Sequence, residues 1–102
     1  MVFHFHHEAK RELREAILYY HAREPDLNLG AIFNQQVRDA CESLRSTPLI
    51  YRERDEGFRR KNLGRFPFYL GFVIREKRIL ILAVAHSHSR PGYWLDRISE
   101  LP

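Results

Sequence analysis

The first half of the chain shows a short alternation of apolar and polar residues, followed by two stretches of helical spacing. Residues 2–6 alternate over too few positions for a helix, which predicts a short strand. From residue 7 to about residue 23, apolar residues recur every three or four positions, which predicts a helix ended by Pro25. The same spacing from about residue 28 to about residue 46 predicts a second helix, antiparallel to the first.

Each predicted helix has one apolar stripe that we expect to face the core. The stripes consist of Ala9, Leu13, Ala16, Ile17 and Tyr20 in the first helix and Phe33, Val37, Ala40, Cys41 and Leu44 in the second. The other faces of the first helix carry Glu8, Lys10, Arg11, Glu12, Arg14 and Glu15. Cys41 is the only cysteine, which excludes an internal disulfide and a multi-cysteine zinc site. Because it falls on an apolar stripe, we interpret it as a small core residue rather than a nucleophile.

The second half of the chain has the patterns of a sheet. Residues 58–63 are short and basic and predict an edge strand, and residues 65–75 are rich in aromatic and β-branched side chains. Pro67 must lie at the start of that strand or at an unpaired edge position. After a tight turn, residues 79–85 are apolar throughout, which predicts a central strand covered on both faces. A tail begins at His86.

This order of strand, two helices and three strands predicts an α+β fold with a helical hairpin and a mainly antiparallel sheet. The 102 residues are 44% hydrophobic and 29% charged, as in an ordinary globular protein, so we expect a single domain over residues 1–102. No apolar run approaches the ~18 residues of a membrane span, and no signal-peptide pattern opens the chain. We therefore expect a cytoplasmic protein that does not bind a membrane.

Charge is distributed unevenly along the chain. Residues 1–51 carry a net charge of −1 and residues 52–102 a net charge of +5. Residues 59–90 hold eight basic side chains against the single acidic Glu76, and 14 of the 17 basic residues are arginine. The guanidinium group binds phosphate or carboxylate through two parallel hydrogen bonds, so this half predicts an anionic partner, either nucleic acid or an acidic protein segment. The alternative is ordinary surface charge on a solvated strand face.

The tail holds the residue types that could carry chemistry, and three interpretations compete. One is metal-independent RNA cleavage, with His86 or His88 as acid or base. In that case Arg59, Arg60, Arg65 or Arg90 could hold the phosphate and Tyr93 could stack on a base. A second is a metal site, for which isolated His-X-His spacings are weak support because zinc needs three or four ligands. The third is structural, with Trp94 folded back as a lid on the core. We predict no metal ion and no cofactor.

Three segments resemble the RelE/ParE toxins of bacterial type II toxin–antitoxin systems, and the similarity covers nearly the whole chain. They are residues 13–20 (LREAILYY), residues 65–68 (RFPF), and residues 81–86 (ILAVAH) running into residues 90–94 (RPGYW). The long hairpin and the Pro-Gly-Tyr-Trp ending resemble the ParE, plasmid-stabilisation branch most. That branch implies a non-enzymatic inhibitor of DNA gyrase, whereas the RelE branch implies a ribosome-dependent mRNA interferase. His88 and Ser89 stand where related sequences often carry arginine, which weakens a phosphate-binding role for the tail but leaves a histidine that a nuclease could use.

Both branches imply an antitoxin that wraps over the helices and sheet of the toxin, usually acidic and folding as it binds. The resemblance and the charge pattern together suggest three sets of site residues, with incidental exposure as the alternative for the apolar ones. The antitoxin contacts would be Leu18, Tyr19, Leu29, Ile32, Arg75 and Arg78. The contacts to gyrase or nucleic acid would be Arg59, Arg60, Lys61, Arg65, Arg90 and Tyr93. The catalytic candidates, if the chain is an endoribonuclease that acts on mRNA at the ribosome, would be His86, His88, Arg90 and Tyr93.

Overall fold

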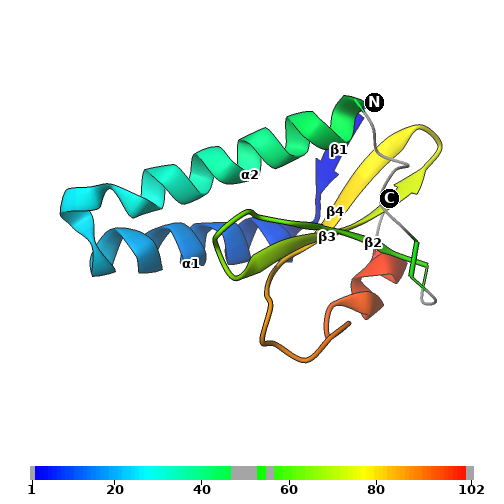
Figure 1. Ribbon diagram of the computed structural model, residues 1–102. Helices are drawn as coiled ribbons and strands as arrows, with labels where there is room; N and C mark the ends of the chain where they lie inside the picture. Colours follow the sequence, from blue (N-terminus) through cyan, green and yellow to red (C-terminus); the bar gives the residue numbers. More distant parts are fainter. Residues whose placement is uncertain (1, 47–52, 55–56, 101–102) are drawn as a thin grey trace.

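The computed structural model describes residues 2–46, 53–54 and 57–100. Its elements follow the chain in the predicted order (Figure 1). They are β1 (Val2–Phe5), α1 (His7–Arg23), the 3-10 turn η1 (Pro25–Leu27), α2 (Leu29–Ser46), β2 (Arg59–Asn62), β3 (Phe68–Arg75), β4 (Arg78–His86) and the 3-10 helix η3 (Leu95–Glu100). Both helices lie where the apolar spacing predicts them. The strand predicted from residue 65 begins only at Phe68, because Pro67 has no N–H to donate to a neighbouring strand.

The four strands form one mixed sheet in the order β1-β4-β3-β2. Strand β3 runs antiparallel to both β2 and β4, whereas β1 runs parallel to β4. A parallel pair needs a long crossover connection, which the α1–α2 hairpin begins. The α+β fold and the mainly antiparallel sheet are therefore confirmed, with β1–β4 as the parallel pair. Strand β2 lies at one edge of the sheet, as its short basic sequence predicts.

The sheet separates two apolar clusters. On the helix face, α1 and α2 pack against β3 and β4, with Phe33, Leu44, Leu70 and Phe72 fully buried. On the tail face, the chain after β4 covers the opposite side of the same strands. Every residue from 79 to 85 is buried, because β4 is covered on both sides as its apolar sequence predicts.

The pairing between β3 and β4 contains one irregularity. Gly71 lies opposite Ala83, but the next residue, Phe72, lies opposite Ile81. Leu82 is therefore an extra residue in β4, as in a β-bulge, and both Leu82 and Ala83 contribute to the tail-face cluster. This places the carbonyl of Leu82 and the N–H of Val84 beside the site described below.

Cys41 packs against the helix-face cluster but remains partly exposed, so it borders the core rather than filling it. Burial raises the pKa of its thiol to about 11, although nearby Arg45 acts in the opposite direction. A thiol with so high a pKa is protonated at neutral pH, which is consistent with its interpretation as a structural residue.

Candidate functional site

The tail after β4 returns along the sheet and is anchored by Trp94. This side chain is fully buried, as predicted, and its indole lies directly against the backbone of β3 at Gly71. A Cβ atom at Gly71 would lie only 2.4 Å from Cζ2 of Trp94, so glycine is needed there for close approach. The indole Nε1 donates a hydrogen bond to the hydroxyl of Tyr69 at 3.1 Å, and Phe58 packs edge-on at 4.7 Å between ring centroids.

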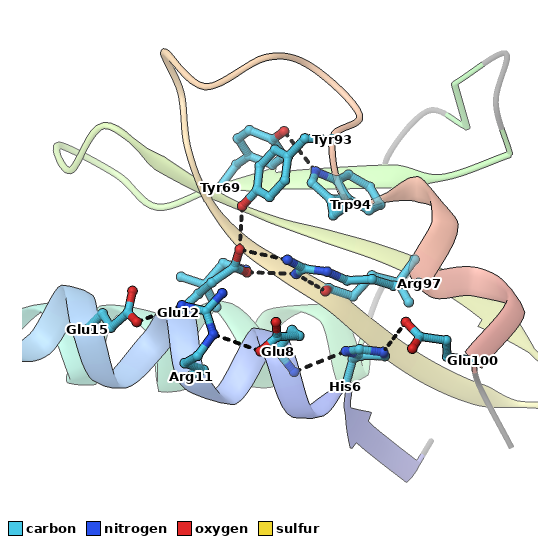
Figure 2. Close-up of polar contacts among 12 residues, drawn as sticks. His6, Glu8, Arg11, Glu12, Glu15, Tyr69, Tyr93, Trp94, Arg97 and Glu100 are labelled. Carbon is cyan, nitrogen blue, oxygen red and sulfur yellow. Dashed lines mark hydrogen bonds and ion pairs between the residues drawn. The ribbon is translucent and has the colours of Figure 1, made fainter.

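A carboxylate from α1 joins this tail to the sheet (Figure 2). Glu12 accepts hydrogen bonds from Nη1 and Nη2 of Arg97 at 2.9 and 3.1 Å. It also accepts from the hydroxyl of Tyr93 at 2.5 Å and from the N–H of Val84 at 3.1 Å. Nη1 of Arg97 donates in addition to the carbonyl of Leu82 at 2.9 Å. The charged side chains are only 12% and 11% exposed, so this is a nearly buried ion pair with its hydrogen bonds satisfied.

The position of Glu12 differs from the expectation that it lies on a polar outer face of α1. Its side chain points toward the tail, where it meets Arg97, which is 85 residues away in the sequence. Burial alone would lower the pKa of Arg97, but the hydrogen bonds and charge of Glu12 outweigh that effect and raise it. Burial, followed by the hydrogen bond to Glu12, raises the pKa of the Tyr93 hydroxyl well above its ordinary value. Tyr93 is therefore neutral and Arg97 charged at neutral pH.

A second contact joins the end of the tail to the start of α1. The His6 ring is buried, and its Nδ1 accepts a hydrogen bond from the N–H of Glu8 at 3.1 Å, which caps the helix. In the neutral ring the proton is then on Nε2, which donates to Oε1 of Glu100 at 3.1 Å (Figure 2). Arg97 and Glu100 thus tie η3 to α1 at two points. In the described part of the chain, no three His, Cys, Asp or Glu side chains gather as metal ligands would.

The basic residues of β2 do not share one face of the sheet. Arg60 lies opposite Gly71 and its guanidinium stacks over the ring of Tyr69, 3.8 Å from the centroid, on the tail face. Arg59 lies opposite Phe72 on the helix face and pairs with Glu53 at 3.2 Å. Lys61, two residues further along the strand, points to the same face as Arg59.

The remaining basic candidates are separated from one another by the topology. Arg65 is exposed in the β2–β3 connection and Arg90 is exposed in the tail loop. Arg75 and Arg78 face each other beside the β3–β4 turn, at the opposite end of the sheet from Arg65. The basic residues that make the sequence asymmetric in charge therefore occupy several separate positions rather than one continuous basic face.

Of the two histidine candidates, His86 ends β4 on the helix face and His88 follows it in the exposed loop. His86 is half-buried opposite Phe68, with 5.1 Å between ring centroids, and its Nδ1 accepts from the N–H of His88 at 3.0 Å. It borders a groove of about 470 Å³ that is also lined by Tyr19 and Leu29 of the hairpin. An adjoining hollow of about 320 Å³ brings His86 and Tyr93 together. Arg59, Arg60, Lys61 and Arg90 line neither hollow.

The apolar candidates gather at the closed end of the helical hairpin, which extends beyond the sheet (Figure 1). Leu18 is 65% exposed and Tyr19 is 52% exposed, and Ile32 is exposed on α2. Leu29 is half-buried beside them in the groove. Leu27, which the sequence reasoning missed, is also strongly exposed. It could have been found as an apolar residue outside both helical stripes.

Comparison with known proteins agrees with this fold. The family described as the ParE toxin of the type II toxin-antitoxin system, parDE, matches residues 3–91. A chain of the solved "Chromosomal ParDE TA system from P. aeruginosa" superimposes with a TM-score of 0.70 at 23% identity, covering 84% of this chain and 95% of that one. No curated protein matches the sequence. Within residues 2–46, 53–54 and 57–100, no helix is both long and apolar enough to cross a membrane. The chain belongs to the ParE family of toxins of type II toxin–antitoxin systems.

Proposed function

We propose that this ParE-family toxin inhibits DNA gyrase, acts in the cytoplasm, and is neutralised by a cognate antitoxin. The observation that carries the choice over RNA cleavage is the separation of His86 from the basic side chains. His86 lines both hollows beside the hairpin, whereas Arg59, Arg60, Lys61 and Arg90 line neither. An RNase would need its acid or base and its phosphate-binding cations close together around one phosphate.

The surface proposed for the antitoxin is the closed end of the hairpin with its adjoining groove. Exposed apolar residues clustered at one end of a small protein are typical of a protein-binding surface. Arg23 lines the groove and lies over the ring of Tyr19, 5.1 Å from its centroid, so a carboxylate of the partner could pair beside an apolar contact. An acidic, amphipathic segment fits this combination.

The surface proposed for gyrase is the tail loop, residues 87–91, whose side chains are exposed. Arg90 gives this loop a positive charge, and the adjacent Trp94 anchor holds its end on the sheet. Arg65 lies in the β2–β3 connection, whose Pro67 carbonyl accepts a hydrogen bond from the N–H of Ser87 at 2.8 Å, so the two basic positions lie near one end of the sheet.

A supercoiling assay with purified gyrase tests this proposal. We expect the protein to cause accumulation of cleaved DNA, and we expect its antitoxin to prevent that accumulation. Arg90→Ala should weaken the effect, whereas Arg38→Ala, which removes an exposed arginine from α2, should not. Gyrase that is unaffected by the parent protein would contradict the proposal. The next test would then be cleavage of mRNA on translating ribosomes, with His86→Ala and His88→Ala beside the parent.

A further inference from the structure

We infer that Glu12 is a positioning residue for the toxin's target-binding surface: from inside the molecule, its carboxylate sets the conformation of the tail loop that meets the target. The inference rests on the proposed function in assigning that loop to the target. It adds a residue that lies outside the proposed surface and whose side chain is nearly buried. The pairing of Glu12 with Arg97 and Tyr93 is the geometry that carries it.

The loop is fixed at both ends and exposed between them. At its start, the N–H of Ser87 donates to the carbonyl of Pro67 at 2.8 Å and the N–H of Ser89 donates to that of His86 at 3.0 Å. At its end, Tyr93 and the tail behind it are held by Glu12. Only the second anchor depends on side chains that are far apart in the sequence, so it is the anchor that one substitution can release.

Glu12 gathers four hydrogen bonds at this anchor, from three different parts of the chain. Two come from Arg97, one from Tyr93 and one from the N–H of Val84 in β4. Without the carboxylate, the nearly buried Arg97 would keep its charge but lose its partner, a strongly unfavourable state. Movement of Arg97 into water would remove this cost, and it would carry Tyr93 and Trp94 away from the sheet.

The rest of the fold does not depend on this anchor. The helix-face cluster is separate from the tail-face cluster and contains the packed residues of both helices. Leu18, which belongs to the surface proposed for the antitoxin, is exposed further along α1 and does not line the hollow that Glu12 and Tyr93 share with Tyr19. Loss of Glu12 should therefore alter the target surface and leave the antitoxin surface in place.

Trp94 provides a direct readout of the tail because it is the only tryptophan and is fully buried. In Glu12→Gln we expect its emission to shift to longer wavelength and its quenching by acrylamide to rise. Gyrase inhibition and growth arrest on expression should fall roughly tenfold or more, since the lost pair is nearly buried. Antitoxin affinity should stay within about twofold of the parent's, because exposed residues away from the change contribute independently. Glu15→Gln is the matched control, because it removes the same charge from an exposed pair with Arg11 on the same helix.

Arg97→Lys is the second variant, and it keeps a cation while losing the two parallel hydrogen bonds to Glu12. We expect it to give a smaller emission shift and a partial loss of growth arrest, so the inference remains testable if Glu12→Gln does not fold. Unchanged Trp94 emission in Glu12→Gln would overturn the inference, and so would a released tail with full toxicity. A parent protein that arrests growth but leaves gyrase untouched would instead refute the proposed target, while the emission and growth measurements would still decide the role of Glu12.

Discussion

The helix face and the tail face of the sheet are covered by segments of different kinds. The helix face is covered by two long helices with regular apolar stripes, and its cluster is almost entirely aliphatic and aromatic. The tail face is covered by an irregular segment that a single indole and a buried ion pair hold in place. Periodic apolar packing tolerates many sequences, whereas the tail depends on a few specific partners. Substitutions on the two faces should therefore have different effects on the protein.

The largest effect is expected on the helix face, at Phe33. Its ring is fully buried and lies within 5.1–5.4 Å of the rings of Phe66, Phe68 and Tyr20. Phe33→Ala should lower the free energy of unfolding by about 4 kcal/mol, because it leaves a cavity inside a packed aromatic cluster. Denaturant unfolding followed by circular dichroism measures this change. A loss below about 1 kcal/mol would contradict the view that this cluster carries the fold.

A smaller and more local effect is expected at Gly71 on the tail face. The added Cβ of Gly71→Ala would meet Trp94 at 2.4 Å, so the indole must move away from the strand. We expect a loss of about 2 kcal/mol, as is usual for overpacking, together with a red shift of Trp94 emission. If Trp94 emission does not change, the close approach of the indole to β3 is wrong.

Alkaline pH should weaken the contact between Tyr93 and Glu12 that holds the tail. The pKa of Tyr93 is raised by burial and by the hydrogen bond to Glu12, so its stabilising contribution is complete below the ordinary tyrosine pKa of 10.0. That contribution is lost as the pH rises through the raised pKa, because the phenolate can no longer donate to the Glu12 carboxylate. Titration of Trp94 emission from about pH 9 upward should show this loss in the parent and show less of it in Tyr93→Phe. Identical curves for both proteins would contradict the assignment.

The smallest effect on the fold is expected at Cys41, at the margin of the helix face, where only the reactivity of the thiol is measured. A pKa of about 11 in place of 9.0 leaves roughly one hundredth as much thiolate at pH 8. Alkylation of Cys41 in the folded protein should therefore be about a hundredfold slower than that of a free cysteine, and should become faster as the pH rises toward that value. Alkylation at the free-cysteine rate would mean that the helix face is open at this position.

The same contrast explains which features the sequence could predict. Both helices and the buried central strand follow from apolar spacing, which is a local property of the chain. The family followed from short segments that resemble the ParE branch, and the match over residues 3–91 confirms it. The parallel β1–β4 pair could not be derived, because strand order depends on contacts that no local pattern records.

For a similar reason, the ion pair of Glu12 with Arg97 could not be predicted from local sequence patterns. On α1, Glu12 is one of several charged residues, and only the fold shows that it faces the tail rather than water. The second half of the chain does contain an excess of basic residues. However, side chains alternate along β2, which places Arg59 and Arg60 on opposite faces of the sheet. A count of charges along a chain does not show which of them share a surface.

We propose that the toxin keeps its target surface apart from its antitoxin surface, and a paired measurement on two variants decides whether it does. Gyrase inhibition and antitoxin affinity are measured for Glu12→Gln and for Leu18→Glu, which places a charge on the exposed end of the hairpin. We predict that Glu12→Gln loses inhibition and keeps its antitoxin affinity, and that Leu18→Glu keeps inhibition and loses antitoxin affinity. Loss of both properties together in either folded variant would contradict the account.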